Sequence, residues 1–402
     1  MAPVGAGGWS VRTRTRVVLA FIGAVLLGLG GFAVWEEGIP AFQRSQDVPE
    51  VSRSEVLSLP EQVYDPPEFV PGTDKWGPPG PVSMVFQGRE AKVGFGGEVK
   101  GPWYAVSARN GVYSRLAPPD VEQVDGGLWL GPQGTQVAWR HPGGIARYDT
   151  MTGESQTYQV PGTAEASGPL VWSPDSTRLA FGTDPVQVLD TRSGEVTDLP
   201  LRATASDGVT PAWTADGRWV TLADDEGIEA VEVESGQRRT LPAPVGGFRG
   251  AEWNTAGDLA GMHPTQHSNV LRIVRAPGLE TGGSSAQVDD EVPEDLVIQG
   301  LWGWSDPDQV VLTGLRPETG ALEQAVTFSL PDDDVQPFML MPTKGVNWAG
   351  VGTVSQATDL LSEPTRAFEE PQQEWSPTSK LRLCLLLAVF PAVYFLIARR
   401  AK

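Results

Sequence analysis

Residues 171–182 read V-W-S-P-D-S-T-R-L-A-F-G and predict one β-hairpin. The first strand ends at Trp172, the turn is S-P-D-S at 173–176, and the second strand includes residues 179–181. Proline at the second turn position and aspartate at the third fit a type I turn. The same unit recurs in weaker form along most of the chain, so this hairpin predicts the architecture of the protein.

Two landmarks recur together. An aromatic residue recurs at the first-strand position, as Phe86, Trp129, Trp172, Trp213, Trp253, Trp304 and Trp348. A glycine in a later turn follows the first five of these anchors, as Gly111, Gly153, Gly194, Gly236 and Gly278. A repeat of about forty residues with four short strands is typical of the blades of a β-propeller.

The predicted fold is therefore all-β, a β-propeller of six to seven four-stranded blades over residues 82–361. The apolar faces of each blade need neighbouring blades to cover them, so the ring must close. The unit that opens at Trp348 is only half complete. Either this fragment augments an existing blade, or residues 55–63 supply a missing strand and complete a seventh blade.

Apolar stretches flank the repeats at residues 17–35 and 381–398. About nineteen apolar residues are enough for a transmembrane helix. No convincing cleavage site and no cysteine follow the first stretch, which predicts an uncleaved anchor rather than a signal peptide or a lipoprotein. Three arginines precede the first stretch and a basic tail follows the second, so we expect both termini in the cytoplasm and the propeller outside the cell membrane of a bacterium.

The other segments follow from these boundaries. Residues 36–81 and 362–380 are expected to be linkers, the first of them rich in proline. Residues 1–16 and 399–402 are expected to be cytoplasmic tails.

Composition limits the function classes. The formal net charge is −20, and the basic residues at the two ends leave the middle more acidic still. An acidic surface argues against nucleic acid as a partner, because that affinity comes from neutralising phosphates. The single cysteine, Cys384, excludes a disulfide within the chain and is compatible with either side of a bacterial membrane.

The stretch W-S-P-D-S-T-R-L-A-F at 172–181 resembles the PD40 repeat of TolB-like, WD40-like bacterial propellers, whose pattern is roughly W-S-P-D-G-x-x-I-A-F. Units at Trp129, Trp213, Trp253 and Trp304 keep parts of the pattern, so the resemblance covers roughly residues 82–345. It implies a propeller that takes part in protein–protein interaction at bacterial membranes. The motif is structural, so no functional residue is carried across, and the two anchors depart from the soluble periplasmic members.

Candidate chemistry is sparse. Ser173-x-Asp175 faintly resembles the Asp box of sialidases, but the arginine cluster and Tyr–Glu pair of those enzymes are missing. His263 and His267 are four residues apart around Pro264, which indicates a loop rather than a metal site. The acidic runs at 224–226 and 332–334 lack the spacing of a calcium loop. No G-x-S-x-G elbow and no P-loop are present, so no catalytic, metal or cofactor residue is predicted.

Three tryptophans, Trp139, Trp219 and Trp302, lie outside the repeat register. They could anchor a partner at the surface. Core packing is favoured, because large aromatic side chains are usually buried.

The sequence predicts a non-enzymatic, extracytoplasmic module that binds a protein or a cell-envelope component. The alternative is a propeller enzyme or carbohydrate-binding protein with its site at the central channel. Residues on the channel-lining strands distinguish the two, because convergent carboxylates and histidines favour chemistry, whereas a flat face edged with aromatics favours a partner. The oligomeric state is left open.

Overall fold

The computed structural model describes residues 56–371 with gaps, and the structural statements below concern these residues. The gaps are 68–69, 71, 89, 94–96, 119–126, 161–168, 183, 203–208, 225–226, 242–246, 265–268, 276–285, 289–296, 316–323, 331–333 and 342–353.

The chain divides into two compact units. One consists of Val56–Ala91 and Val99–Gln372, and the other of Met1–Glu55, Lys92–Glu98 and Gln373–Lys402. The two predicted membrane-spanning stretches lie outside the described residues. Within the described part of the chain, no helix is both long enough and apolar enough to cross a membrane.

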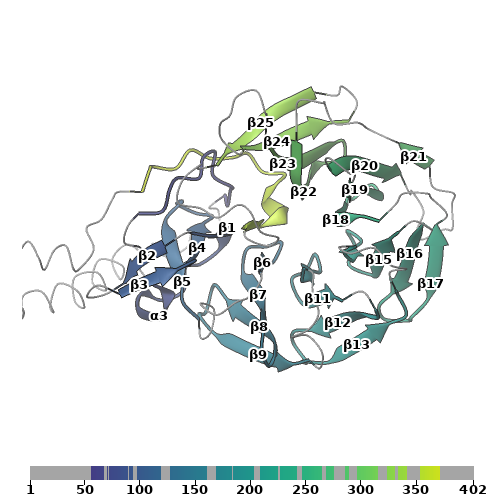
Figure 1. Ribbon diagram of the computed structural model, residues 1–402, viewed down its shortest axis with the longest axis horizontal. Coiled ribbons are helices and arrows are strands. Elements are labelled where there is room, and N and C mark those ends of the chain that lie inside the picture. The colour runs from purple at the N-terminus through teal and green to yellow at the C-terminus, as the bar shows by residue number, and fades with distance from the viewer. Residues whose placement is uncertain are drawn as a thin grey trace, which may run out of the picture. The chain divides into compact units, whose positions relative to one another are not determined.

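Six four-stranded antiparallel sheets are arranged as blades around a centre (Figure 1). Each of blades 2 to 6 is one continuous stretch of chain, and its first strand is the innermost. Blade 2 consists of β6 (Leu128–Leu130), β7 (Gln136–His141), β8 (Gly144–Asp149) and β9 (Ser155–Gln159). Blade 3 consists of β10 (Val171–Trp172), β11 (Arg178–Phe181), β12 (Val186–Asp190) and β13 (Val196–Leu199). Blade 4 consists of β14 (Ala212–Trp213), β15 (Trp219–Ala223), β16 (Ile228–Glu232) and β17 (Arg238–Leu241).

Blades 5 and 6 have longer strands. Blade 5 consists of β18 (Arg249–Trp253), β19 (Asp258–Pro264), β20 (Asn269–Arg275) and β21 (Ala286–Val288). Blade 6 consists of β22 (Val297–Asp306), β23 (Gln309–Leu315), β24 (Gln324–Ser329) and β25 (Asp334–Leu340). Consecutive strands pair throughout, so the topology of these blades is the simple meander that the repeat predicts.

Blade 1 combines the two ends of the ring. Its innermost strand is β26 (Val354–Gln356), followed outward by β1 (Val82–Gln87), β4 (Trp103–Ser107) and β5 (Tyr113–Leu116). Met84 of β1 lies opposite Gln356 of β26. The fragment after Trp348 therefore augments an existing blade, and the described residues form six blades rather than seven. A separate two-stranded sheet, β2 (Glu90–Val93) and β3 (Gly97–Lys100), lies between β1 and β4 in the sequence.

Of the closing strand considered at residues 55–63, the structure describes residues 56–63, and these instead form an extended segment with isolated bridges. Its backbone bonds the end of β25, where Val63 N donates to Leu340 O at 2.9 Å and Leu340 N donates to Glu61 O at 2.9 Å. Leu59 and Val63 are buried in the core of blade 1 and its neighbours. The segment fills the seam between blades 6 and 1 without adding a strand.

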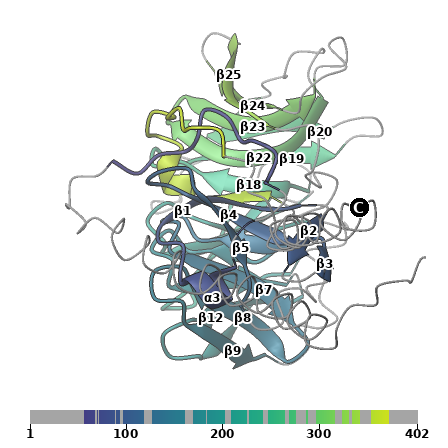
Figure 2. The same cartoon turned by 90° about the vertical axis from the view of Figure 1, so that its left-hand side faces the viewer.

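The C-terminal segment completes this seam. After β26 the chain forms the short 3-10 helix η3 (Thr358–Leu360), and Arg366 then bonds the N-terminal segment. Arg366 N donates to Leu59 O and Glu61 N donates to Arg366 O, both at 2.9 Å. Figure 1 and Figure 2 show these purple and yellow segments side by side at the edge of blade 1. Both flanks of the propeller thus enter and leave at one place.

The hairpin at 171–182 has the predicted turn. Ser173 Oγ accepts a hydrogen bond from Arg178 N at 2.9 Å and donates one to Asp175 Oδ1 at 2.6 Å. Ser176 has φ of 55°, and Gly134 and Gly217 have φ of 70° and 66° at the same place in blades 2 and 4. Glycine adopts this left-handed conformation without the penalty of a Cβ, which explains why the PD40 pattern has glycine there.

Trp172 packs between blades 2 and 3, as the repeat predicts. Its cluster includes Ile145 and Tyr158 from blade 2 and Leu179 and Phe181 from its own blade. The three tryptophans outside the register are also core residues, because Trp139, Trp219 and Trp302 expose only 1%, 2% and 6% of their surface. The alternative that these three anchor a partner at the surface is wrong.

Two aromatic anchors do not occupy the position of Trp172. Trp172 lies opposite Leu179 of the second strand, and in blade 2 the matching residue is Leu130, opposite Val137. Trp129 therefore precedes the register position by one residue. Phe86 lies in the second strand of blade 1, and Gln356 takes the register position there. An aromatic side chain fills the core between blades from either strand, so aromatic spacing alone cannot distinguish the strands.

Candidate functional site

The innermost strands line the central channel, and each carries one residue at the register position of Trp172. From blade 1 to blade 6 these are Gln356, Leu130, Trp172, Trp213, Trp253 and Trp304. We call them the register residues. All but Trp304 are buried, and each lies where its blade meets a neighbouring blade.

The four register tryptophans bond each blade to the blade before it. Three of them donate the indole N–H to a main-chain oxygen of the preceding innermost strand: Trp172 to Trp129 O at 2.9 Å, Trp213 to Val171 O at 3.0 Å and Trp304 to Glu252 O at 2.9 Å. Trp253 donates instead to the hydroxyl of Thr221 in blade 4 at 2.8 Å. The Thr221 hydroxyl in turn donates a hydrogen bond to Ala212 O at 3.2 Å, so the two bonds together still connect Trp253 to the preceding innermost strand.

Blade 1 joins the same chain of bonds without an aromatic residue. Gln356 Nε2 donates to Trp302 O of blade 6 at 3.0 Å. Leu130 N of blade 2 donates to Ser355 Oγ of blade 1 at 2.9 Å. All six interfaces between blades are therefore bridged near the channel, and at each one the donor belongs to the later blade of the ring. Such a bond contributes about 0.5–1.5 kcal/mol to stability.

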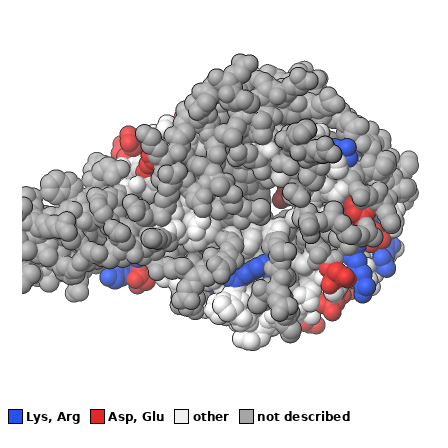
Figure 3. Space-filling model, viewed as in Figure 1, with Lys and Arg blue, Asp and Glu red and all other residues white. Residues whose placement is uncertain are grey.

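Glu252 is a carboxylate on the innermost strand of blade 5. It precedes Trp253 on β18, and its side chain is partly buried. Its main-chain oxygen accepts the hydrogen bond from the indole N–H of Trp304. Burial raises the pKa of Glu252 to about 7. Figure 3 shows acidic atoms inside the opening at the middle of the ring. A carboxyl group with this pKa exists in both protonation states near neutral pH and can donate or accept a hydrogen bond.

No convergent catalytic set accompanies Glu252 on the described innermost strands. The other charged residues there are Arg249 at the start of β18 and Asp306 at the exposed end of β22, and histidine is absent from these strands. In the part of the chain that the structure describes, no three histidine, cysteine, aspartate or glutamate residues lie close enough to hold a metal ion.

The candidate residues from the sequence lie apart from the channel-lining strands. His263 is in β19, a second strand rather than a loop, opposite Val270, and His267 lies outside the described residues. His141 ends β7, and its Nδ1 accepts a hydrogen bond from Gly143 N at 3.0 Å. Most of the acidic runs at 224–226 and 332–334 also lies outside the described residues, although Asp224 is buried.

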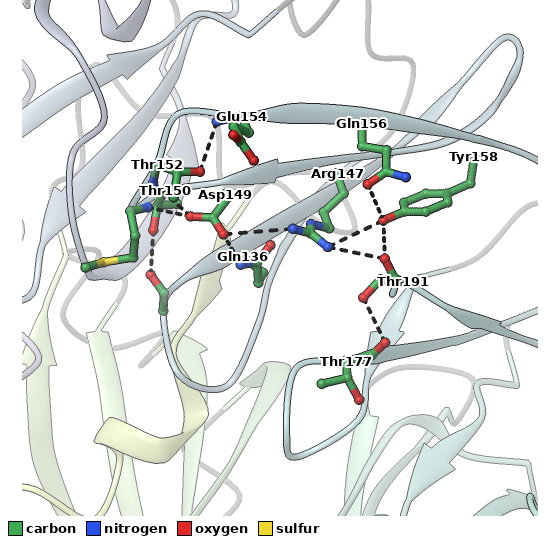
Figure 4. Close-up of polar contacts among 12 residues, drawn as sticks. Gln136, Arg147, Asp149, Thr150, Thr152, Glu154, Gln156, Tyr158, Thr177 and Thr191 are labelled. Atoms are coloured by element: carbon green, nitrogen blue, oxygen red, sulfur yellow. Dashed lines mark hydrogen bonds and ion pairs between the residues drawn. The ribbon is translucent and has the colours of Figure 1, made fainter. Parts of the chain in front are cut away.

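A polar cluster ties blades 2 and 3 together farther from the channel (Figure 4). Tyr158 Oη donates to Thr191 O of blade 3 at 2.5 Å, and Arg147 donates to the same oxygen at 3.3 Å. The Asp149 carboxylate accepts a hydrogen bond from Gln136 Nε2 at 2.7 Å and forms an ion pair with Arg147, with 3.8 Å between Oδ2 and Nη2. Burial alone would raise the pKa of Asp149, but hydrogen bonds from Gln136 and from two main-chain N–H groups outweigh it and lower the pKa. The cluster is committed to holding the two blades.

The blade-closing residues Ser355 and Gln356 could not be found from sequence. They carry neither the aromatic residue nor the turn motif of the repeat, and they follow the half-complete unit at Trp348. The only sequence signal for these residues was that the last repeat, which opens at Trp348, is incomplete. It shows that a partner strand is needed but not which residues make the bonds.

Comparisons with known proteins support no family assignment. No protein-family model matches the chain, and no curated protein matches it. Among solved structures, TolB from Acinetobacter baumannii is similar with a TM-score of 0.46 and 15% identity over 70% of this chain and 68% of that one. A putative TolB from Agrobacterium tumefaciens has a TM-score of 0.38 and 13% identity over 55% of this chain and 85% of that one. Hydrazine synthase from Kuenenia stuttgartiensis has a TM-score of 0.38 and 11% identity over 55% of this chain and 67% of that one.

These likenesses are too weak to carry a functional argument. The architecture itself rests on the strand order and pairing of the six blades.

Proposed function

We propose that this protein is a membrane-anchored, extracytoplasmic β-propeller that binds a protein or another component of the bacterial cell envelope, and that it is not an enzyme. Its fold would then belong with the TolB-like, PD40-type propellers that residues 172–181 resemble. Residues 17–35 and 381–398 would be the two membrane spans, with both termini in the cytoplasm.

One observation carries the binding function. The four register indoles, the Gln356 amide and the Ser355 hydroxyl on the innermost strands bond blade to blade. A catalytic site needs several polar groups that converge on a substrate, and these groups converge on neighbouring strands instead. What the ring offers to a partner is its rigid set of surface turns.

A partner can be located with a photo-crosslinking amino acid placed in these turns. In intact cells producing the full chain, we expect a discrete crosslinked product from one or more of Asp175, Asp216 and Asp308, which are exposed at first hairpin turns of three blades. The matched control is Gln136, which is committed to Asp149 inside the blade 2 cluster. If no position gives a product above the control, the binding function is contradicted.

Topology is tested separately in spheroplasts. Added protease should digest the propeller and spare tags fused to both termini. Loss of either tag while the propeller stays protected would contradict the proposed orientation and the extracytoplasmic location.

The alternative is a carbohydrate-binding or enzymatic site at the central channel, and Glu252 is the observation that favours it. A protonated carboxyl group on a channel wall can donate a hydrogen bond to a sugar hydroxyl or oxygen. The test is binding of soluble cell-wall saccharide fragments to the full chain in detergent. Binding that Glu252→Gln weakens, and that the exposed-turn variant Glu234→Gln leaves unchanged, would favour the channel site.

A further inference from the structure

One face of the propeller carries the first and third hairpin turns of blades 2, 3 and 4 and the third turn of blade 1, because strands alternate in direction across each antiparallel sheet. We call it the turn face. Both flanks of the propeller reach it at blade 1, where Ser58 N donates to Ala108 O at 3.1 Å and Arg366 Nη1 approaches Arg109 O at 3.5 Å. Residues 108 and 109 belong to the third turn of blade 1, between β4 and β5.

Large exposed apolar side chains gather at this place. Among the described residues, four such side chains are exposed, and three of them are Val56 at 64%, Val112 at 52% and Met151 at 44%. Val56 begins the segment that bonds Ala108, and Val112 lies in the same turn as Ala108. Met151 lies in the third turn of blade 2.

Hydrogen bonds place the two turns next to each other. Ala108 N donates to Pro81 O at 2.9 Å, and Gly80 N donates to Thr150 O at 2.9 Å. Residues 77–81, the segment just before β1, form what we call the strap. Its consecutive residues Gly80 and Pro81 therefore bond the turn of Met151 and the turn of Val112, respectively. We call this region, with Val56, Val112 and Met151 at its surface, the blade 1–2 corner.

The turn face exposes charged residues both at the corner and at the other blades. At blades 3, 4 and 6 the turns expose acidic residues with few basic ones among them: Asp175, Glu195, Asp216, Glu234, Asp306 and Asp308 against Arg192 and Arg218. Around the corner the cations Lys75, Arg109 and Arg366 lie among a larger number of exposed acids, which are Asp74, Glu154, Asp359, Glu363, Glu369 and Glu370. Acidic residues therefore outnumber basic ones on both parts of the turn face, and charge does not distinguish the corner from the other blades.

Aromatic side chains complete the corner. Phe368 is partly exposed and packs against Gly111, and Arg366 lies over its ring with 5.6 Å between the guanidinium carbon and the ring centroid. Trp76 is also partly exposed, two residues before the strap residue Pro78. Exposed aliphatic groups with aromatics and cations around them are the composition of surfaces that rest at a membrane interface.

We infer that the blade 1–2 corner rests on the lipid surface through its exposed apolar and aromatic side chains. The described chain ends at residue 371, and the second apolar stretch begins at residue 381. Ten residue steps reach at most about 35 Å, so the corner cannot be far from a membrane that holds this stretch. The inference rests on the proposed membrane anchoring.

The test uses the full chain with Cys384→Ala, reconstituted in vesicles of phosphatidylcholine with a minor fraction of phosphatidylglycerol. A polarity-sensitive fluorophore is attached to a single cysteine introduced as Val112→Cys or Met151→Cys. The matched control is Ser235→Cys, which is exposed in the third turn of blade 4. We expect a blue shift and quenching by brominated lipid at both corner positions, and neither at Ser235→Cys.

Three outcomes would contradict the inference in distinguishable ways. If the protein does not float with the vesicles, the membrane anchoring itself fails. If it floats and the corner labels respond like the control, anchoring stands and the corner does not touch lipid. If the corner labels shift in native membranes but not in lipid vesicles, a protein partner covers the corner instead of lipid.

Discussion

Blades 3 and 1 are held in the ring by bonds of the same kind with different side chains. In blade 3 the register residue is Trp172, part of one continuous meander, and its indole bonds blade 2. In blade 1 the register residue is Gln356, brought by the last strand of the propeller, and its amide bonds blade 6. The difference shows that an amide can replace the indole as the side-chain donor at the register position, whereas at Leu130 of blade 2 the main-chain N–H is the donor.

The two blades differ more in what covers them. Trp172 fills an apolar space between Ile145, Tyr158 and Phe181. At the seam this filling is supplied by chain flanks, with Leu59 and Val63 from one side and Leu361 from the other. The seam therefore depends on segments distant in sequence, and the meander blades depend on single large side chains.

The largest expected effect is at Trp172. Trp172→Ala removes the indole bond and leaves a cavity between blades 2 and 3, so we expect a loss of about 3–5 kcal/mol in the free energy of unfolding. Chemical unfolding of the full chain in detergent, followed by near-UV circular dichroism, measures it. A loss below about 1 kcal/mol would place Trp172 at the surface and remove the contrast with blade 1.

Glu252 should make stability depend on pH. Its raised pKa means that the folded state holds a proton that the unfolded state releases, so stability falls as pH rises from its ordinary 4.5 to about 7 and is level above that. Glu252→Gln should therefore stabilise the protein at pH 8 by about 2–3 kcal/mol relative to its effect at pH 4. Glu234→Gln, an exposed turn variant, is the control. Equal pH profiles for the wild type and Glu252→Gln would show that this carboxyl group is solvated.

Gln356→Leu tests whether the amide hydrogen bond at the seam contributes to stability in the way that the indole bonds do in the other blades. It keeps the bulk of the side chain but leaves Trp302 O without its donor, which costs about 1–3 kcal/mol for a buried acceptor. We expect hydrogen exchange to accelerate at residues 354–357 and in β1 before it does so in blade 3. Uniform acceleration in all blades would contradict a seam that opens locally.

Ser176→Gly should have the smallest effect. Residue 176 has φ of 55°, which glycine adopts freely, and the other described hairpins of this type have glycine there. We expect a change within about 0.5 kcal/mol in thermal unfolding, because the greater entropy of glycine in the unfolded state offsets the relief of strain. A loss above about 1 kcal/mol would mean that the Ser176 side chain is needed where it lies against Gly131.

The sequence predicted the blades better than their closure. Trp172 and the turn at 173–176 repeat with the period of a blade, and the glycines at 111, 153, 194 and 236 have the positive φ that a hairpin turn requires. Closure could not be derived in the same way, because Gln356 and Ser355 follow no repeat. The choice between six and seven blades depended on pairing between segments at opposite ends of the propeller, and a local pattern does not encode such pairing.

In the candidate site, too, some residues could be predicted from the sequence and others could not. Trp139 and Trp219 were correctly weighed toward the core because large aromatics are usually buried. Glu252 escaped notice, since an isolated glutamate before an anchor tryptophan resembles any surface residue until the strand is placed at the channel. Its raised pKa arises from neighbours that the fold assembles, not from the sequence around it.

The most direct test of the ring is a disulfide across its closing strand. Ser355 lies opposite Val85 in the pairing of β26 with β1. In a Cys384→Ala background, Ser355→Cys with Val85→Cys should crosslink within the monomer under mild oxidant, and Ser355→Cys with Val171→Cys, two blades away, should not. Absence of the first crosslink, or equal crosslinking of both pairs, would contradict a six-bladed ring closed by its C-terminal strand.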